Sequence, residues 1–231
     1  MSRREPMVCE AVKACGALYL ALENHENSFS AGAAQHYHAT TSALFRPLST
    51  KTRSKQYTEM CAVIATINIV YEMMSGTELM EHITTARALI QECHWNALSS
   101  GLARACFWFN VGMDALNSVM CNSSVAWDPD QWGYDPGESV ISSLREIPTP
   151  EAWVHKLLYI LAKTVTHCAT KPRARSPGAT GGGQLAQRAQ AWDYLTQLCN
   201  WCRDVTPRRM QPLASLDPRF QSRTCYFPNP G

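Results

Sequence analysis

Apolar residues recur every three or four positions over most of the chain, and this spacing predicts helices. Clear stop signals divide the pattern, such as Ser75-Gly76 after the third segment. No segment keeps the alternation of apolar and polar residues that a half-buried strand needs. The sequence therefore predicts an all-α fold, an irregular multi-helix bundle of about seven helices. The expected helices cover residues 5–23, 31–47, 53–74, 77–93, 99–120, 149–169 and 185–204.

The fifth of these helices, 99–120, has the strongest pattern. Its apolar stripe has spacings of 4, 3, 4, 3 and 4, through Leu102, Cys106, Phe109, Met113, Leu116 and Met120. Asn110, Asp114 and Asn117 make a narrow polar face. A helix this apolar is expected to be mostly buried. Its polar residues should then lie at a rim or find local partners.

Proline and glycine gather in three places that we expect not to be helical. These are a loop at 121–138, a flexible linker at 171–184 and an irregular tail at 207–231. The three aromatic residues of the loop are expected to cover the core: Trp127, Trp132 and Tyr134. Since the linker is short, we expect one helical domain over residues 1–231.

The composition limits the classes of function. The chain has 231 residues, of which 45% are apolar and 17% charged, with a formal net charge of +2. Such near-neutrality gives no electrostatic attraction to a phosphate backbone. The charged start and the short apolar runs predict neither a signal peptide nor a membrane span. We therefore expect a soluble intracellular protein with reduced cysteines.

Candidate chemical sites are few. Cys199 and Cys202 form a Cys-x-x-Cys pair, but it lacks further zinc ligands, so we interpret it as core packing. His36 and His38 would point apart on a helix. Asp128, Asp130 and Asp135 are expected to make turns rather than a calcium site. Because no catalytic signature occurs either, we expect no catalytic residue, no cofactor and no metal.

Three stretches resemble the middle homology region of fungal binuclear zinc-cluster transcription factors. The first is an apolar helix that ends in Tyr71-Glu72, followed by a turn and a helix with His82. The second is an apolar helix with Phe107-Trp108 and then Asp114. The third is a helix with two tryptophans and a proline-rich exit, which supplies Trp192, Trp201 and Pro212.

The chain departs from the family at two points. The family pattern places an arginine before the aspartate, where this sequence has Gly112, so Asp114 needs another partner. The zinc cluster needs six cysteines within a few dozen residues, whereas the first 60 residues here contain only Cys9 and Cys15. We therefore expect the chain to correspond to a middle segment of such a regulator or to a shortened relative.

The resemblance implies a nuclear regulatory protein of a fungus that influences a metabolic or secondary-metabolite gene cluster. Its partners would be zinc-cluster regulators or transcription machinery, with an unknown small-molecule effector and without specific DNA binding of its own. One alternative is a dimerisation module that acts on a full-length relative. Another, from a different class, is a small helical enzyme. The family-motif residues themselves are expected to be structural, with a regulatory role as the alternative. His82 is expected to form a hydrogen bond between helices.

Overall fold

A computed structural model describes residues 6–24, 27–45, 54–76, 80–135, 150–169 and 181–209. Within these residues the chain is all-α, as predicted, with seven α-helices, a short 3-10 helix and no strand. The helices are α1 (Pro6–Asn24), α2 (Asn27–Phe45), α3 (Lys55–Ser75), α4 (Met80–Glu92), α5 (Gly101–Cys121), the 3-10 helix η2 (Pro129–Gln131), α7 (Pro150–Ala169) and α8 (Gly181–Arg209).

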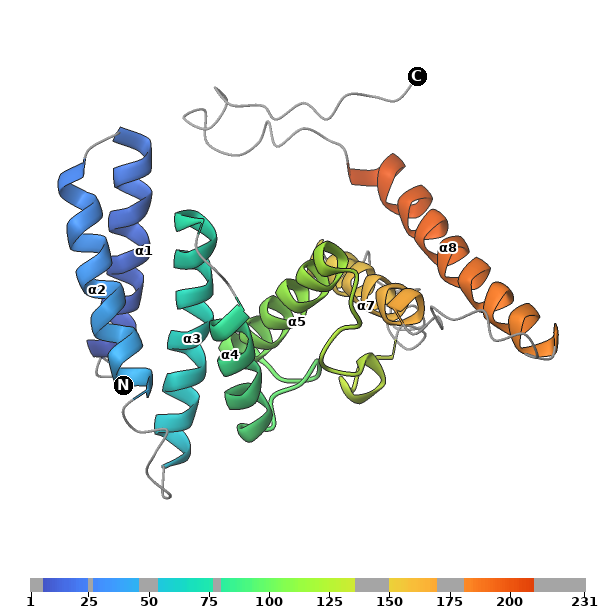
Figure 1. Ribbon diagram of the computed structural model, residues 1–231, viewed down its shortest axis with the longest axis horizontal. Helices are drawn as coiled ribbons and strands as arrows, with labels where there is room; N and C mark the ends of the chain where they lie inside the picture. The colour runs from blue at the N-terminus through green and yellow to red at the C-terminus, as the bar shows by residue number, and fades with distance from the viewer. Residues whose placement is uncertain are drawn as a thin grey trace.

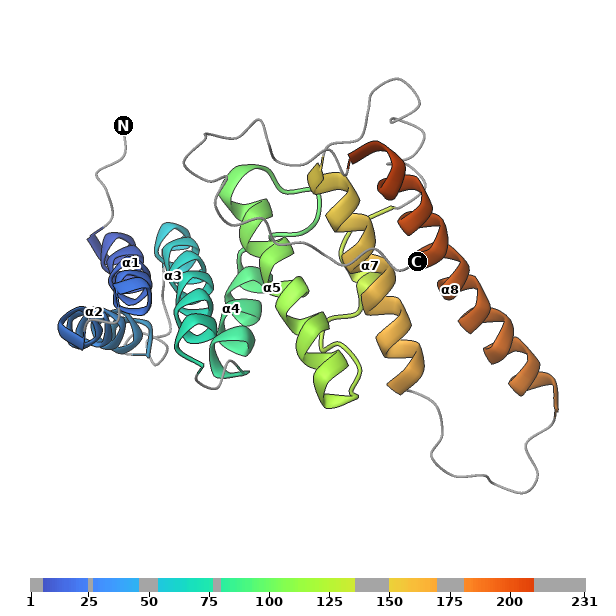
Figure 2. The same ribbon diagram turned by 90° about the horizontal axis from the view of Figure 1, so that it is seen from above.

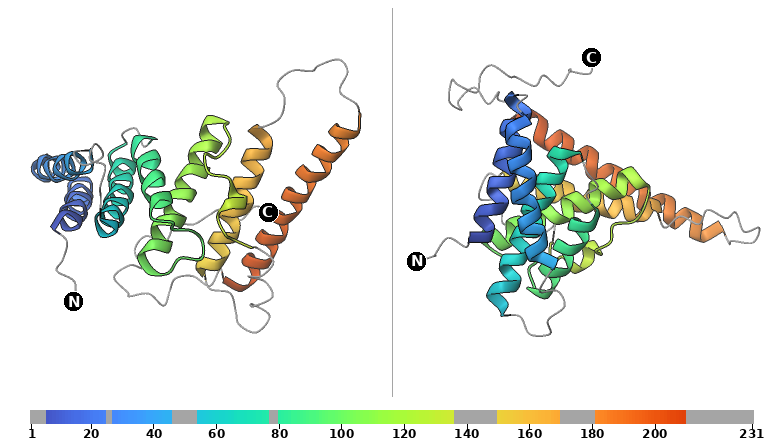
Figure 3. Two further views of the ribbon diagram at one scale, coloured as in Figure 1. Left: turned by 90° about the horizontal axis from the view of Figure 1, so that it is seen from below. Right: turned by 60° about the vertical axis from the view of Figure 1, so that its left-hand side comes forward.

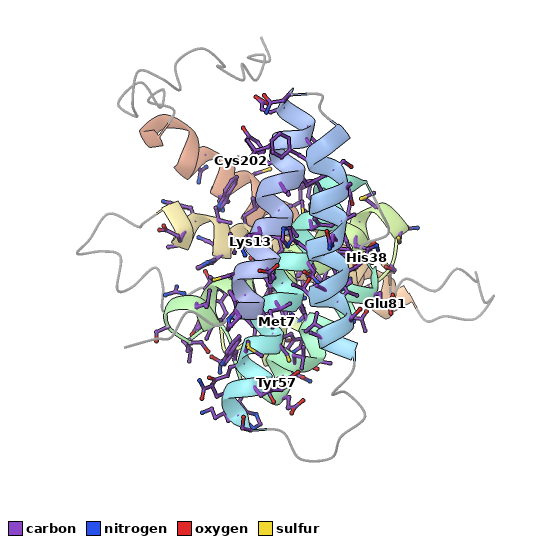
Figure 4. The ribbon with its side chains drawn as sticks, turned by 90° about the vertical axis from the view of Figure 1, so that its left-hand side faces the viewer. Met7, Lys13, His38, Tyr57, Glu81 and Cys202 are labelled. Atoms are coloured by element: carbon purple, nitrogen blue, oxygen red, sulfur yellow. The ribbon has the colours of Figure 1, made fainter. Side chains whose placement is uncertain are left out.

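The helices form a row in which each packs mainly on the helices beside it in the row (Figure 1). The order along the row is α2, α1, α3, α4, α5, α7 and α8 (Figures 1 and 2). The view from below gives the same order (Figure 3, left), and α1 and α2 form the front of the end-on view (Figure 4). The irregular bundle is thus drawn out along one axis, with the core at its centre.

Local sequence signals set the ends of the central helices. Ser54 caps α3, because its Oγ accepts a hydrogen bond from the Tyr57 amide at 3.3 Å. Gly76 ends the helix in the left-handed conformation, with φ of 72°. Asn122 ends α5 in the same way, with φ of 50°. The predicted stop at Ser75-Gly76 is therefore confirmed.

The limits of α8 differ from the prediction. Residues 181–184, assigned to the linker, and residues 207–209, assigned to the tail, are helical. The prediction excluded them because glycine and proline are poor helix formers. For the glycines at 181–183 the cost is smallest, because they lie in the first turn, where backbone N–H groups have no intrahelical partner in any case. Pro207 lies in the last turn of α8, so only a short stretch of helix follows it. The rest of the linker and tail, including Pro212, lies outside the described residues.

Aromatic side chains make the centre of the core. Phe107 is fully buried and meets Trp108, Trp127 and Trp132 edge to face, with ring centroids 5.2 to 5.9 Å apart. Edge-to-face pairs add to the hydrophobic contribution of these large rings. The Trp132 indole nitrogen donates to the Trp127 carbonyl oxygen at 3.2 Å. Both tryptophans of the loop are buried, which confirms that they cover the core.

The buried face of α5 matches the predicted apolar stripe only in part. Cys106 and Met113 are buried, at 3% and 8% exposed, as the stripe predicts. Leu102, Leu116 and Met120 are 61%, 49% and 85% exposed. Asn110 and Asp114 are instead buried, although they were assigned to the polar face. The stripe was misleading because α4 and the segment after α5 provide polar partners on the inner side. Asn110 Nδ2, for example, donates to the Ile83 carbonyl oxygen at 3.0 Å.

Candidate functional site

A buried polar cluster joins α2, α3 and α4. Glu72, near the end of α3, is 4% exposed, and His82 on α4 is 2% exposed. His82 Nδ1 lies 2.6 Å from Glu72 Oε1. The Tyr37 hydroxyl of α2 donates to the same carboxylate oxygen at 2.6 Å. Because a buried carboxylate without partners is very unfavourable, these two contacts are what make the burial of Glu72 tolerable.

Asn68 extends this cluster toward α2. Its Nδ2 donates to Thr41 Oγ1 at 3.2 Å, and its Oδ1 accepts from the Thr40 hydroxyl at 3.2 Å. The same Nδ2 lies 3.4 Å from His82 Nε2. An amide group can only donate from nitrogen, so this contact makes Nε2 an acceptor and places the neutral ring's proton on Nδ1, facing Glu72. The Tyr37, Asn68, Glu72 and His82 group is called the α2–α4 polar cluster below.

Tyr71 is buried beside the α2–α4 polar cluster. Its ring stacks on Tyr37, with centroids 4.3 Å apart and planes 12° from parallel. Burial, reinforced by the hydrogen bond to the Glu72 carboxylate, raises the pKa of Tyr37. The Tyr37 hydroxyl therefore remains protonated at neutral pH and acts as a donor. The first landmark thus supplies three adjoining side chains: Tyr71, Glu72 and His82.

Asp114, the polar residue of the second landmark, has a different buried partner. Arg87 of α4 places Nη1 3.1 Å from Asp114 Oδ1. The other carboxylate oxygen, Oδ2, accepts from the Ala126 amide at 2.8 Å. Asp114 therefore connects α5 to α4 and to the segment that follows α5. Arg87 fills the role that the family pattern gives to a neighbour of the aspartate.

Gly112 stands where the family pattern has that arginine, and α7 occupies the space beside it. A Cβ atom at Gly112 would lie 3.4 Å from Leu158 Cδ1 and 3.5 Å from Cδ2. A methyl group would just fit this space, whereas an arginine side chain would displace Leu158. A side chain as large as arginine at position 112 is therefore incompatible with the observed position of α7.

Trp108 joins α5 to α7 through His155. The two rings stack with centroids 4.0 Å apart and planes 9° from parallel. Arg104 Nη2 lies 3.4 Å from His155 Nδ1, so this ring nitrogen is an acceptor. Burial and the nearby Arg104 charge lower the pKa of His155 to about 4. At neutral pH the histidine is therefore an uncharged stacking partner.

The third landmark lies on α8 and is divided between two faces. The Trp201 indole nitrogen donates to the Trp153 carbonyl oxygen of α7 at 2.8 Å. Trp192 is 68% exposed, and Cys199 and Cys202 are exposed as well. The interpretation of the two cysteines as core packing was wrong. A change of one residue in helical position moves a side chain by about 100°, so Trp201 can face α7 while its flanking cysteines do not.

The remaining candidates have structural partners. His36 Nδ1 lies 2.6 Å from Glu10 Oε2, in a pair that links α2 to α1. The Asp128 side chain accepts from the Asp130 amide at 3.0 Å, which confirms its predicted turn role. Asp130 also binds Lys163 of α7 at 2.7 Å. Among the described residues, no group of three or more His, Cys, Asp or Glu side chains could hold a metal ion.

The three landmarks thus do not converge on one site. Glu72 and His82 contact each other. On α5, Trp108 contacts α7 whereas Asp114 contacts α4. Trp201 lies on α8. Sequence reasoning missed Tyr37, Asn68, Arg87 and His155. Arg87 had a usable signal, because it is the one arginine of α4 and lies between the buried residues Ala86 and Leu89. Tyr37 and His155 had no signal in the sequence around them.

In comparisons with known proteins, no family model, no curated protein and no solved structure matches this chain. In the described part of the chain, no helix combines the length and the apolar character that crossing a membrane requires.

Proposed function

We propose that the chain is a helical regulatory domain of the kind found in fungal zinc-cluster transcription factors, and that it acts through protein contact and not through catalysis. The observation that carries the proposal is the Glu72–His82 pair, 2.6 Å apart across α3 and α4. These are the two polar residues of the first landmark, and they bind each other. Residues of a motif that serves to hold helices together are expected to contact each other in this way.

The second landmark gives independent support. Asp114 binds Arg87 at 3.1 Å and the Ala126 amide at 2.8 Å, so this motif residue also joins parts of the fold. Each of its two carboxylate oxygens has a partner within the chain. In contrast, a catalytic carboxylate must reach a substrate. Under this proposal the protein belongs in the nucleus, and it influences the expression of a metabolic gene cluster through zinc-cluster regulators or transcription machinery.

A pull-down with the full chain tests the partner class. The tagged chain is expressed in its native cells, and the recovered proteins are identified by mass spectrometry, with an unrelated helical protein on the same tag as the control. We expect a zinc-cluster regulator or a component of the transcription machinery to be recovered with this chain only. Recovery of neither class would contradict the proposal.

A second experiment tests the absence of direct DNA recognition. The purified chain is titrated onto a pool of random DNA sequences at low and at raised salt. We expect only weak binding that disappears with salt, because the chain is nearly neutral. Sequence discrimination that persists at raised salt would show that the chain reads DNA itself.

A small helical enzyme is the second candidate, and the α2–α4 polar cluster is the observation that favours it. Glu72 and His82 are buried and titratable, Tyr37 is half-buried, and both Tyr37 and His82 lie within hydrogen-bonding distance of the Glu72 carboxylate. The enzyme ranks second because these three side chains contact one another, whereas catalytic groups must contact a substrate. If this cluster were catalytic, the Tyr37→Phe variant would bind a substrate normally and lose turnover.

A further inference from the structure

Two exposed thiols lie one turn apart on α8. Cys199 and Cys202 are both solvent-exposed, and the helix is continuous from Gly181 to Arg209. Side chains three positions apart on a helix are neighbours, with Cβ atoms about 5 to 6 Å apart. The two sulfur atoms can therefore reach a common point above the helix surface.

The contact between α8 and α7 keeps these thiols on the outer side of the row. Trp201 is fixed to α7 by its hydrogen bond to the Trp153 carbonyl oxygen. Tyr194, one heptad earlier, is buried on the same side. Trp192 is 68% exposed and Leu195 is 47% exposed, and their spacing of 3, 4 and 3 with the cysteines places all four side chains on one outward face. Figures 1 and 2 show α8 at the end of the row, and Figure 4 labels Cys202 on it.

The spacing of the two thiols decides which bonds they can form and which centre they can bind. A disulfide needs Cβ atoms about 3.5 to 4.5 Å apart, closer than neighbours on a regular helix, and it also needs an oxidant. A structural zinc ion needs four ligands, and the described residues offer no group of even three. A three-coordinate centre needs only two thiolates from the protein. With bonds to sulfur of about 2.3 Å, a single bridging atom spans sulfurs about 3.5 to 4 Å apart.

We propose that Cys199 and Cys202 form a dithiol site for a three-coordinate thiophilic centre of the trivalent-arsenic type. For an organic arsenic oxide, two sulfur–arsenic bonds form and the arsenic–oxygen bond breaks. The two thiol protons leave with the oxygen as water, and arsenic keeps its oxidation state. The organic group occupies the third position, on the outward face of α8. This site goes beyond the proposed regulatory function and does not depend on it.

The test uses the full reduced chain and phenylarsine oxide as the probe. After a wash with a monothiol, intact mass spectrometry measures the retained adduct. We expect one arsenical for each wild-type chain, released by a dithiol such as dithiothreitol. Cys199→Ser and Cys202→Ser should each lose the retained adduct, because one remaining sulfur–arsenic bond exchanges with the monothiol.

Two other exposed cysteines provide matched controls. Cys121→Ser and Cys168→Ser remove single thiols of similar exposure and should keep the adduct at the wild-type level. Circular dichroism checks that every variant keeps its helices, as expected for exposed positions. Equal retention in wild type and in both Cys199→Ser and Cys202→Ser, or no retained adduct in wild type, would overturn the proposal.

Discussion

Arg87 on α4 and Asp114 on α5 form a nearly buried ion pair, with Nη1 3.1 Å from Oδ1. The two side chains are 14% and 6% exposed, so little water screens the contact. The pair crosses between consecutive helices at the centre of the row. It also supplies the partner that Asp114 needs in the absence of an arginine at position 112.

Removal of Arg87 should strongly destabilise the fold. Arg87→Met keeps much of the apolar stem but leaves the Asp114 carboxylate with only the Ala126 amide. We expect the free energy of unfolding to fall by about 3 kcal/mol, the cost of breaking a buried pair on one side. Urea denaturation measures this change. In Arg87→Met/Asp114→Asn the charge is also removed, so the double variant should be more stable than the sum of the two single effects predicts. Simple additivity would show that the two residues do not interact.

In the α2–α4 polar cluster, a change at Glu72 should lower the free energy of unfolding more than a change at Tyr37. Tyr37→Phe removes one hydrogen bond to Glu72 and should lower the free energy of unfolding by about 1 kcal/mol. Glu72→Ala leaves both Tyr37 and His82 without this carboxylate, and we expect a loss of about 3 kcal/mol. Both values come from urea denaturation at pH 7. Equal costs would contradict the central place of Glu72 in the cluster.

An arginine at position 112 should harm this chain. Gly112→Arg must displace Leu158 of α7, and overpacking of this kind costs about 2 kcal/mol. Gly112→Ala should be neutral or stabilising by up to about 1 kcal/mol, because alanine favours helix and its methyl group fits. Gly16→Arg is the matched control, since nothing lies within 4 Å of a Cβ there. Thermal melts of the three variants check this order; a Gly112→Arg variant as stable as Gly16→Arg would show that α7 does not restrict this position.

His155 should make the fold less stable in mild acid. Its pKa in the folded protein is about 4, below the ordinary value of 6.5, so the unfolded chain binds more protons between these pH values. Stability from this residue is therefore lost as pH falls below about 6.5, by about 2 kcal/mol between pH 7.5 and pH 5. Urea denaturation of wild type and His155→Gln at both pH values isolates the effect. The variant should lose less stability on acidification, and identical losses would contradict the assignment.

The helices of this chain are predictable because their signals are local. Periodicity and the Ser75-Gly76 stop placed the third helix at 53–74, close to the observed Lys55–Ser75. The inward face of α5 was not predictable, because burial of Asn110 depends on the Ile83 carbonyl oxygen of another helix. An apolar stripe reports hydrophobicity and carries no information on such partners.

The candidate site was predictable only in part. His82 was expected to bind across helices, and its contact with Glu72 confirms this. Tyr37 reaches the same carboxylate from 35 positions away, and nothing near it in the sequence indicates that contact. The exposed position of Cys199 and Cys202 depends on the rotation of α8, which the bond from Trp201 to α7 determines. The nuclear location, the partners and the effector stay predictions.

Among the helices that the structure describes, α8 packs substantially on one, α7. Cooperativity in such an arrangement passes from each helix to the next, so the end helix can detach while the centre stays folded. Backbone amides of α8 should therefore exchange with deuterium well before those of α3 and α5. A ligand that bridges two turns of α8 would slow amide exchange in that helix alone. The exchange rates of the other helices would not change.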